Sequence, residues 1–191
     1  MQRIQTLMMF CLGAIPVWVL LRGAWLLLRR QRIRPWREAA MAVFAVFMTG
    51  VLCMTLRGEW DTPARMLQAA AERIRTHDMM HLRPFESIGI LLAMEDVPEM
   101  LIQMLGNTLL FVPWGFFLPL LWPRWRSVWR MAGMALLLTL FIECTQLFID
   151  RYVEFDDVML NFLGAMSGAG LWWLLHRVWP GMDGVLLAGK S

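Results

Sequence analysis

A single glutamate interrupts a long apolar segment, and this residue type in this setting is the strongest chemical signal in the sequence. Glu143 lies inside the segment 131–149, and Gln146 follows three residues later on the same helix face. An ionisable side chain within a membrane-spanning helix is energetically costly, so its presence predicts a functional role. The alternative is that Glu143 hydrogen-bonds to neighbouring helices and only holds them together.

A second group of polar and small residues recurs at helical spacing further along the chain. Asp157, Asn161, Gly164 and Gly168 are spaced so that they share one helix face. For Asn161, a ligand contact and an interhelical hydrogen bond both stay open. The two glycines form a surface that another helix can approach closely, which makes it a candidate contact for a second copy of the chain or another membrane protein.

The elements that must position these side chains are expected to be membrane-spanning helices. Of the 191 residues, 59% are hydrophobic and only 17% are charged, which is too few for the surface of a soluble domain of this size. The apolar residues form blocks of about 18 or more, the length needed to cross a bilayer. The sequence therefore predicts an all-α, polytopic membrane helix bundle that forms a single membrane domain over 1–191. About five transmembrane helices are expected, at 7–28, 39–56, 100–122, 131–149 and 158–178.

The placement of the arginines predicts how these helices are oriented. Five arginines lie between the first two predicted helices and three between the third and fourth, whereas only Arg151 lies between the last two. The positive-inside rule places the arginine-rich connections in the cytoplasm. We therefore expect the N-terminus outside and the C-terminus in the cytoplasm. The connection 57–99 is then extracytoplasmic, and it separates a two-helix hairpin, 7–56, from a three-helix core, 100–178.

A short amphipathic helix is expected within the extracytoplasmic connection. Thr62-Pro63 is a helix-start signal, because proline is favoured at the first position of a helix. The apolar side chains that follow, from Met66 to Ile74, fall on one face, and Glu72 and three arginines fall on the other. This pattern is typical of a helix that lies on the membrane surface.

The predicted topology brings the intramembrane polar residues to one depth. Asn107 lies seven residues into a helix that runs inward, while Glu143 and Asn161 lie near the outer ends of two other helices. At 1.5 Å per residue, these side chains lie within roughly 10 Å of the outer surface. We therefore expect a ligand-binding site in this layer. Its expected residues are Asn107, Glu143, Gln146 and Asn161, with Arg151, Asp156 and Asp157 capping the layer from the outer connection.

Metal, cofactor and nucleic-acid binding are not expected. His77 and His81 are four residues apart, but no third ligand stands at a recognisable spacing. No glycine-rich phosphate loop is present. The net charge of +3 comes mostly from arginines beside the apolar blocks, where membrane orientation explains them better than binding to nucleic acid.

Several short motifs follow one another between position 81 and about position 175. They are His81-Leu82-Arg83-Pro84-Phe85, then Gly-Asn-Thr-Leu-Leu-Phe-Val-Pro-Trp-Gly-Phe at 106–116, then Glu143-x-x-Gln146, and finally Arg151, Asp156-Asp157, Asn161 and Gly164. Their order and spacing resemble the VanZ-like family of bacterial integral membrane proteins. His81 stands where that family usually has asparagine. By this resemblance, His81 and Arg83 join the expected ligand-binding residues.

The resemblance implies a multi-pass protein of the bacterial cytoplasmic (inner) membrane that serves the cell envelope. VanZ itself is linked to lower susceptibility to teicoplanin, a glycopeptide antibiotic, so a contribution to antibiotic resistance is one implied function. The leading hypothesis is that the outer-leaflet site binds the polar head of a lipid-linked envelope component, a glycolipid or a lipoglycopeptide. One alternative is a membrane enzyme on a lipid-linked substrate, with Glu143 as acid or base and Arg151 as charge stabiliser. Another is a structural partner subunit of a membrane complex.

Overall fold

The computed structural model of the protein describes residues 2–29, 34–56, 61–94, 97–149 and 151–181. This described part is almost entirely helical, which confirms the predicted all-α class. Its α-helices are α1 (Gln2–Arg29), α2 (Pro35–Thr55), α3 (Pro63–Thr76), α4 (Glu86–Ala93), α5 (Val97–Leu121), α6 (Val128–Gln146) and α7 (Phe155–Val178). Between them lie a 3-10 turn, η1 (Pro123–Trp125), and two short strands, β1 (Met80–His81) and β2 (Val153–Glu154).

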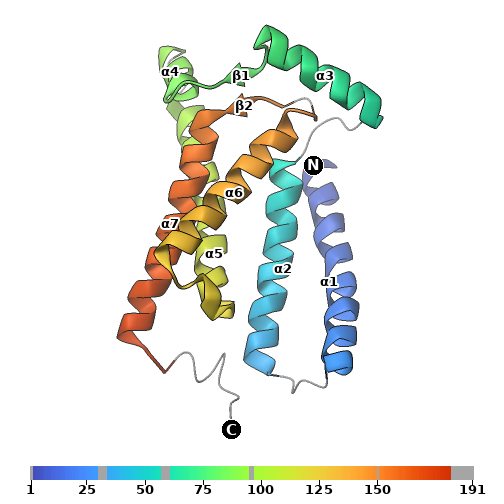
Figure 1. Ribbon diagram of the computed structural model, residues 1–191, viewed down its shortest axis with the longest axis vertical. Helices are drawn as coiled ribbons and strands as arrows, with labels where there is room; N and C mark the ends of the chain where they lie inside the picture. The colour runs from blue at the N-terminus through green and yellow to red at the C-terminus, as the bar shows by residue number, and fades with distance from the viewer. Residues whose placement is uncertain (1, 30–33, 57–60, 95–96, 150, 182–191) are drawn as a thin grey trace.

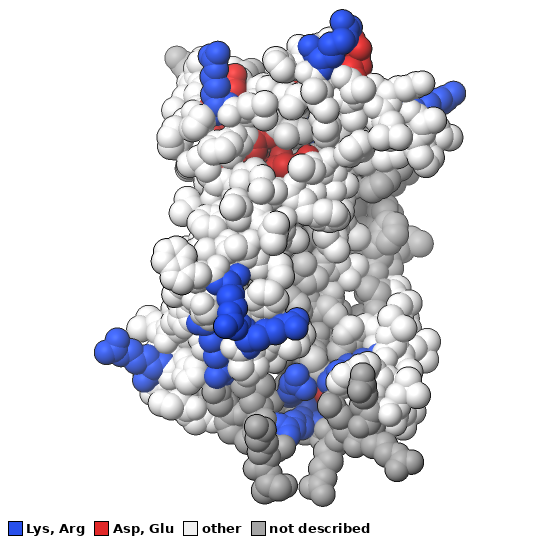
Figure 2. Space-filling model, in the orientation of Figure 1, with Lys and Arg blue, Asp and Glu red and all other residues white. Residues whose placement is uncertain are grey.

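Four of these helices, α2, α5, α6 and α7, are long and apolar enough to cross a membrane. In α1, the apolar segment found among the described residues is Pro16–Leu28, which is shorter than a full span. By length and composition the chain is therefore a multi-pass membrane protein, and a fifth span in α1 stays a prediction. Figure 2 shows charged side chains in the upper part and over the lower half of this face, with an uncharged band between them.

The helices are arranged as a hairpin beside a three-helix group (Figure 1). α1 and α2 run side by side, and α2 also packs against α5. α7 packs against both α5 and α6, while α3, α4, β1 and β2 lie together at one end of the molecule. The chain enters α1 at that same end and leaves α7 at the opposite end.

The predicted helix boundaries agree with the structure to within a few residues. Pro35 and Pro63 begin α2 and α3, at the position where the missing backbone N–H of proline is not needed. The expected amphipathic helix is α3. The connection between β1 and β2 was not predicted: the strands pair in parallel, with Met80 opposite Val153 and His81 opposite Glu154. Arg30, Arg32 and residues 57–60, on which part of the predicted topology rests, lie outside the described residues.

Glycines set the distance between α5 and α7. A β-carbon added at Gly115 would lie 1.8 Å from the backbone oxygen of Ala165, and one at Gly168 would lie 1.9 Å from that of Val112. At Gly164 the corresponding distance, to the backbone oxygen of Thr108, is 2.0 Å. The small-residue face predicted on α7 is thus covered by α5 of the same chain. A contact of this face with a second protein stays untested.

The apolar core lies where α5, α6 and α7 meet and reaches across to α2. Phe111, Met131 and Ile142 are fully buried there, together with Val51 of α2. Because the closely packed helices leave little room, core side chains fix how each helix is rotated about its axis. This packing fixes the directions in which the polar residues of α5, α6 and α7 point.

An ion pair ties α1 to α2 inside the hairpin. Arg22 Nε and Nη2 donate to the two carboxylate oxygens of Glu38 at 2.8 and 2.9 Å, and the guanidinium also lies over the ring of Trp25. Both side chains of the pair are only 16% exposed. The charge that Arg22 brings into the apolar segment of α1 is therefore matched by a partner from the first turn of α2.

Breaking this pair on one side is expected to destabilise the hairpin. Glu38→Gln leaves Arg22 without its counter-charge and should lower the free energy of unfolding by about 1–3 kcal/mol, between the values typical of surface and buried pairs. The double variant Arg22→Met with Glu38→Met removes both charges and should recover most of the loss. Thermal unfolding of the purified variants checks this, and an equal loss in both would contradict it.

Candidate ligand-binding site

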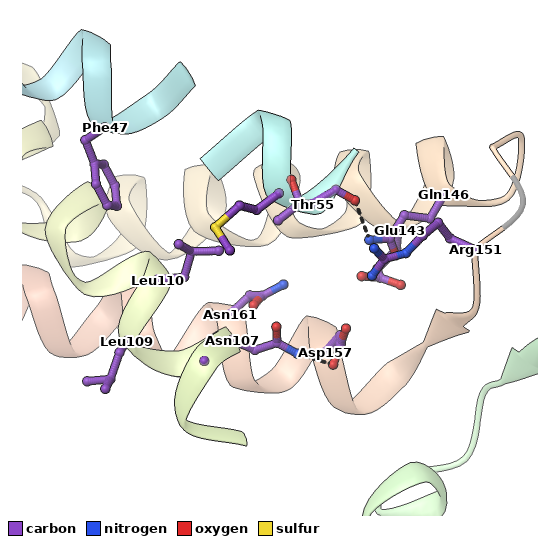
Figure 3. A pocket seen from close by; sticks show the side chains of 12 residues that line it. Phe47, Thr55, Asn107, Leu109, Leu110, Glu143, Gln146, Arg151, Asp157 and Asn161 are labelled. Atoms are coloured by element: carbon purple, nitrogen blue, oxygen red, sulfur yellow. Dashed lines mark hydrogen bonds between the residues drawn. The ribbon is translucent and has the colours of Figure 1, made fainter. Parts of the chain in front are cut away.

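A cavity of about 480 Å³ lies where α2, α5, α6 and α7 meet. Figure 3 shows polar side chains gathered toward one end of it, and Phe47, Leu109 and Leu110 toward the other. Met54 and Thr55 of α2 also border it. We call this cavity the polar pocket. Its polar lining side chains, besides Thr55, are Asn107, Glu143, Gln146, Arg151, Asp157 and Asn161.

Hydrogen bonds to the backbone hold the two polar side chains of α6 in place. Glu143 Oε2 accepts a hydrogen bond of 3.0 Å from the backbone N–H of Glu154 in β2. Gln146 Nε2 donates to the backbone oxygen of Thr55, the last residue of α2, at 2.9 Å. Each bond occupies one end of the side chain, so the direction of the second polar atom is fixed as well.

Three buried oxygens around the pocket accept no hydrogen bond from the described residues: Glu143 Oε1, Gln146 Oε1 and Asn161 Oδ1. Each of these side chains is only 3% exposed. A buried polar atom left without a partner costs about 1–3 kcal/mol, and nearly all such atoms in folded proteins find one. These three buried acceptors without a partner belong to residues that line the pocket.

Charged groups of both signs line the pocket. Asn107 Nδ2 donates to Asp157 Oδ1, which joins α5 to α7. Arg151, from the connection between α6 and β2, lines the same cavity. The described lining residues thus carry two carboxyl groups, on Glu143 and Asp157, and one guanidinium. The pocket combines two carboxyl groups with one guanidinium from the connection between α6 and β2.

Asp156 is adjacent to Asp157 but serves a different part of the molecule. Its carboxylate accepts hydrogen bonds from the backbone N–H groups of Phe85, Ser87 and Ile88 at 2.5, 3.1 and 3.2 Å. Phe85 has φ 64°, a left-handed conformation that is uncommon for a bulky residue. Asp156 stabilises this turn and the first turn of α4, and its side chain is 2% exposed.

The segments that suggested a family resemblance therefore come together in the structure: residue 85 is held by Asp156, and Asn107 is bonded to Asp157. Residues 41–176 match the family model described as VanZ/LLP1. The chain belongs to the VanZ/LLP1 family. All residues that line the polar pocket lie within the matched segment of this VanZ/LLP1 protein. No curated protein and no solved structure matches the chain.

His81 and Arg83 lie outside the polar pocket of this VanZ/LLP1 protein. His81 borders a second cavity of about 220 Å³, where its ring stacks on Tyr152 at 5.3 Å. His81 Nδ1 lies 3.2 Å from Ser87 Oγ and 3.8 Å from Glu154 Oε1. Arg83 is exposed, and its backbone N–H donates to the side chain of Glu86. Six of the nine expected ligand-binding residues thus line the polar pocket, and the other three do not.

Two contributions to the pocket of this VanZ/LLP1 protein were missed in the sequence. α2 supplies one wall, with Phe47, Met54 and Thr55. Thr55 was visible as a polar residue at the end of an apolar segment, but threonine there often bonds its own helix, as Thr55 Oγ1 does with Val51 O at 2.9 Å. The bond from the Glu154 backbone to Glu143 had no sequence signal, because any residue can supply a backbone N–H.

Proposed function

We propose that this chain binds the polar head of a membrane amphiphile in the polar pocket, at the outer leaflet of the bacterial cytoplasmic membrane. The candidate ligands are a lipid-linked cell-envelope component, a glycolipid and a lipoglycopeptide. The arginine distribution favours an N-terminus outside and a C-terminus in the cytoplasm. In that orientation, the end of the molecule with α3, α4 and both strands is the outer end (Figure 1).

The shape of the pocket supports an amphiphile over a small polar solute. Polar side chains line one end, while Phe47, Leu109 and Leu110 line the other (Figure 3). Leu109 is 61% exposed, although it belongs to a helix that is apolar enough to span the membrane. An exposed leucine at that depth would face lipid, so a chain in the pocket could continue into the bilayer beside it.

The cavity among the polar side chains carries the proposal. If the polar cluster served only to hold helices together, its members should pack against one another without leaving space between them. Instead, the polar and charged side chains of three helices and of the connection after α6 line a cavity of about 480 Å³. A cavity with several convergent polar groups is the usual form of a ligand site.

Glu143→Gln tests this proposal, because it removes the charge and one acceptor with almost no change of shape. We expect the variant to unfold at the same temperature as the wild type or higher. The amount of a specific lipid that co-purifies with it should be at least about tenfold lower than with the wild type. Mass spectrometry of lipids bound to the detergent-purified proteins measures the loss. Glu72→Gln is the matched control. It is the same substitution at an exposed position on α3, where Glu72 pairs with Arg75.

The other outcome would assign the cluster to structure. If Glu143→Gln unfolds markedly earlier and neither protein retains a specific lipid, Glu143 holds helices together. The chain would then be better described as a structural subunit of a membrane complex. Should the lipid be lost to the same extent in Glu72→Gln, the loss has nothing to do with the pocket.

A second candidate function is an integral membrane enzyme that acts on a lipid-linked substrate. It is favoured by the way Glu143 is held, with Oε2 fixed by the Glu154 backbone in a residue that lines the pocket. Arg151 would stabilise negative charge on the substrate. The lipid identified on the wild type is the substrate to test: turnover by wild type and not by Glu143→Gln would convert the binding proposal into an enzymatic one.

An effect on teicoplanin susceptibility is proposed only as a consequence of this binding. Teicoplanin carries a lipid tail and a polar head, so it falls within the ligand class. The inhibitory concentration should differ between cells that produce the wild type and cells that produce Glu143→Gln. Equal values would separate this chain from glycopeptide resistance without affecting the lipid proposal.

A further inference from the structure

Three arginines lie close together in the chain at the end of the bundle opposite the two strands. Arg124 belongs to η1, Arg126 follows it, and Arg130 lies in the first turn of α6. Figure 2 shows basic side chains gathered over the region where α5 ends and α6 begins, with no acidic side chain among them. We call Arg124, Arg126 and Arg130 the basic cluster.

Backbone oxygens and an aromatic ring hold side chains of the basic cluster in place. Arg126 Nε donates to the backbone oxygen of Pro119 at 3.2 Å, and its guanidinium lies 4.9 Å from the centre of the Trp172 ring. Arg130 Nη1 donates to the backbone oxygen of Arg124 at 3.1 Å. A backbone oxygen and an aromatic ring carry no net charge, so these contacts orient the guanidiniums without supplying a counter-charge.

The chain itself offers little negative charge to this cluster. Its sequence has no Asp or Glu between Glu99 and Glu143. No carboxylate of the described residues forms an ion pair with Arg124 or Arg130, both of which are exposed. Other arginines do have such partners: Arg22 pairs with Glu38, Arg65 with Asp61, and Arg75 with Glu72. Because like charges repel, an anion from outside the chain would stabilise the basic cluster.

Arginines beside a membrane-spanning helix also orient it, and that role needs no bound lipid. Two observations go beyond it. The guanidinium of Arg124 lies over the ring of Trp125 at 5.1 Å, so it is held as well, and holding a long side chain costs conformational entropy. Trp129, between the arginines and the membrane-spanning part of α6, is 85% exposed. Exposed tryptophans favour the depth of the lipid head groups, where the phosphates lie.

From the charge, the fixed guanidiniums and this depth, we infer that the basic cluster binds the phosphate of an anionic phospholipid. The planar guanidinium matches two oxygens of a phosphate at once, which suits arginine to this ligand. In the proposed orientation the lipid belongs to the cytoplasmic leaflet, where basic sites between helices bind anionic head groups. None of the three arginines lines the polar pocket, so the inference does not depend on the function proposed for that pocket.

Competition between two lipids tests this inference. The purified full-length protein is exposed to an equimolar mixture of phosphatidylglycerol and phosphatidylcholine with identical acyl chains, and mass spectrometry measures the retained ratio. We expect the wild type to enrich phosphatidylglycerol about fivefold or more, and the double variant Arg124→Gln with Arg130→Gln to lose most of this enrichment. The matched control is Arg65→Gln with Arg75→Gln, which removes the same charge from exposed positions on α3 and should keep the enrichment.

Three results would overturn the inference. If the wild type retains both lipids equally, the arginines only orient the helices. An equal loss of enrichment in the two double variants would show that net charge, and not the basic cluster, attracts the lipid. If soluble glycerol phosphate displaces phosphatidylglycerol at equal concentration, the cluster binds a free phosphate and not a lipid. Salt gives a test on the wild type alone, because the enrichment should weaken as ionic strength rises; an enrichment that does not respond to salt would contradict a site built on charge.

Discussion

Gly168→Ala is expected to destabilise the whole bundle, although it adds a single methyl group. The new β-carbon would lie 1.9 Å from the backbone oxygen of Val112 and 2.9 Å from the backbone nitrogen of Phe116. Both atoms belong to the α5 backbone and cannot rotate away as a side chain could, so α5 and α7 must separate. We expect a loss of about 1–3 kcal/mol and a decrease in Tm of about 2–12 °C in detergent.

Gly170→Ala is the matched control for this experiment, two residues further along the same helix. A β-carbon at Gly170 meets nothing within 4 Å. Because alanine is a better helix former than glycine, Tm should stay unchanged or rise by about 2–4 °C. A similar decrease in both variants would show that the helix itself, and not its approach to α5, responds to the substitution.

Asp156→Ala is expected to release α4 from α7 without unfolding the bundle. The substitution leaves the N–H groups of Phe85, Ser87 and Ile88 without the carboxylate that now accepts all three bonds. Bonds to a charged acceptor contribute about 1.5–3 kcal/mol each and are not additive. We therefore expect amide hydrogen exchange at these three positions to accelerate by about a hundredfold or more.

The hydrogen-exchange experiment on Asp156→Ala has two controls. Asp78→Ala removes an exposed aspartate from the segment before β1 and should leave exchange at 85–88 unchanged. Exchange in the middle of α7 should also stay unchanged in Asp156→Ala. If α7 exchanges faster as well, Asp156 stabilises the bundle as a whole. The interpretation that Asp156 only holds the start of α4 is then wrong.

The shared depth of four polar side chains could be predicted because it depends on only two physical regularities. These side chains are Asn107, Glu143, Gln146 and Asn161. Arginines fix the direction in which each helix crosses the membrane, and the constant rise per residue fixes depth. Neither regularity needs any knowledge of packing. The same reasoning gave a shared depth for Asp156 and Asp157, but depth alone does not say which neighbour each side chain meets.

The different roles of the two neighbouring aspartates needed the structure. Asp156 bonds to the start of α4, 68–71 residues away in the chain, and Asp157 bonds to Asn107, 50 residues away. Contacts over such separations leave no periodic pattern in the sequence. α2 was missed for the same reason, since its residues pointing to the pocket and those pointing to lipid are similarly apolar.

The adjacent aspartates have one more consequence, which concerns the angle at which α7 is set. Successive residues of a helix point about 100° apart, so Asp156 and Asp157 reach two different neighbours from one turn. A helix bonded in two directions at the same level cannot roll about its axis without breaking one of the bonds. The pair therefore acts as an angular stop, and it keeps Asn161, one turn further along, aimed at the cavity while the lipid around the protein moves.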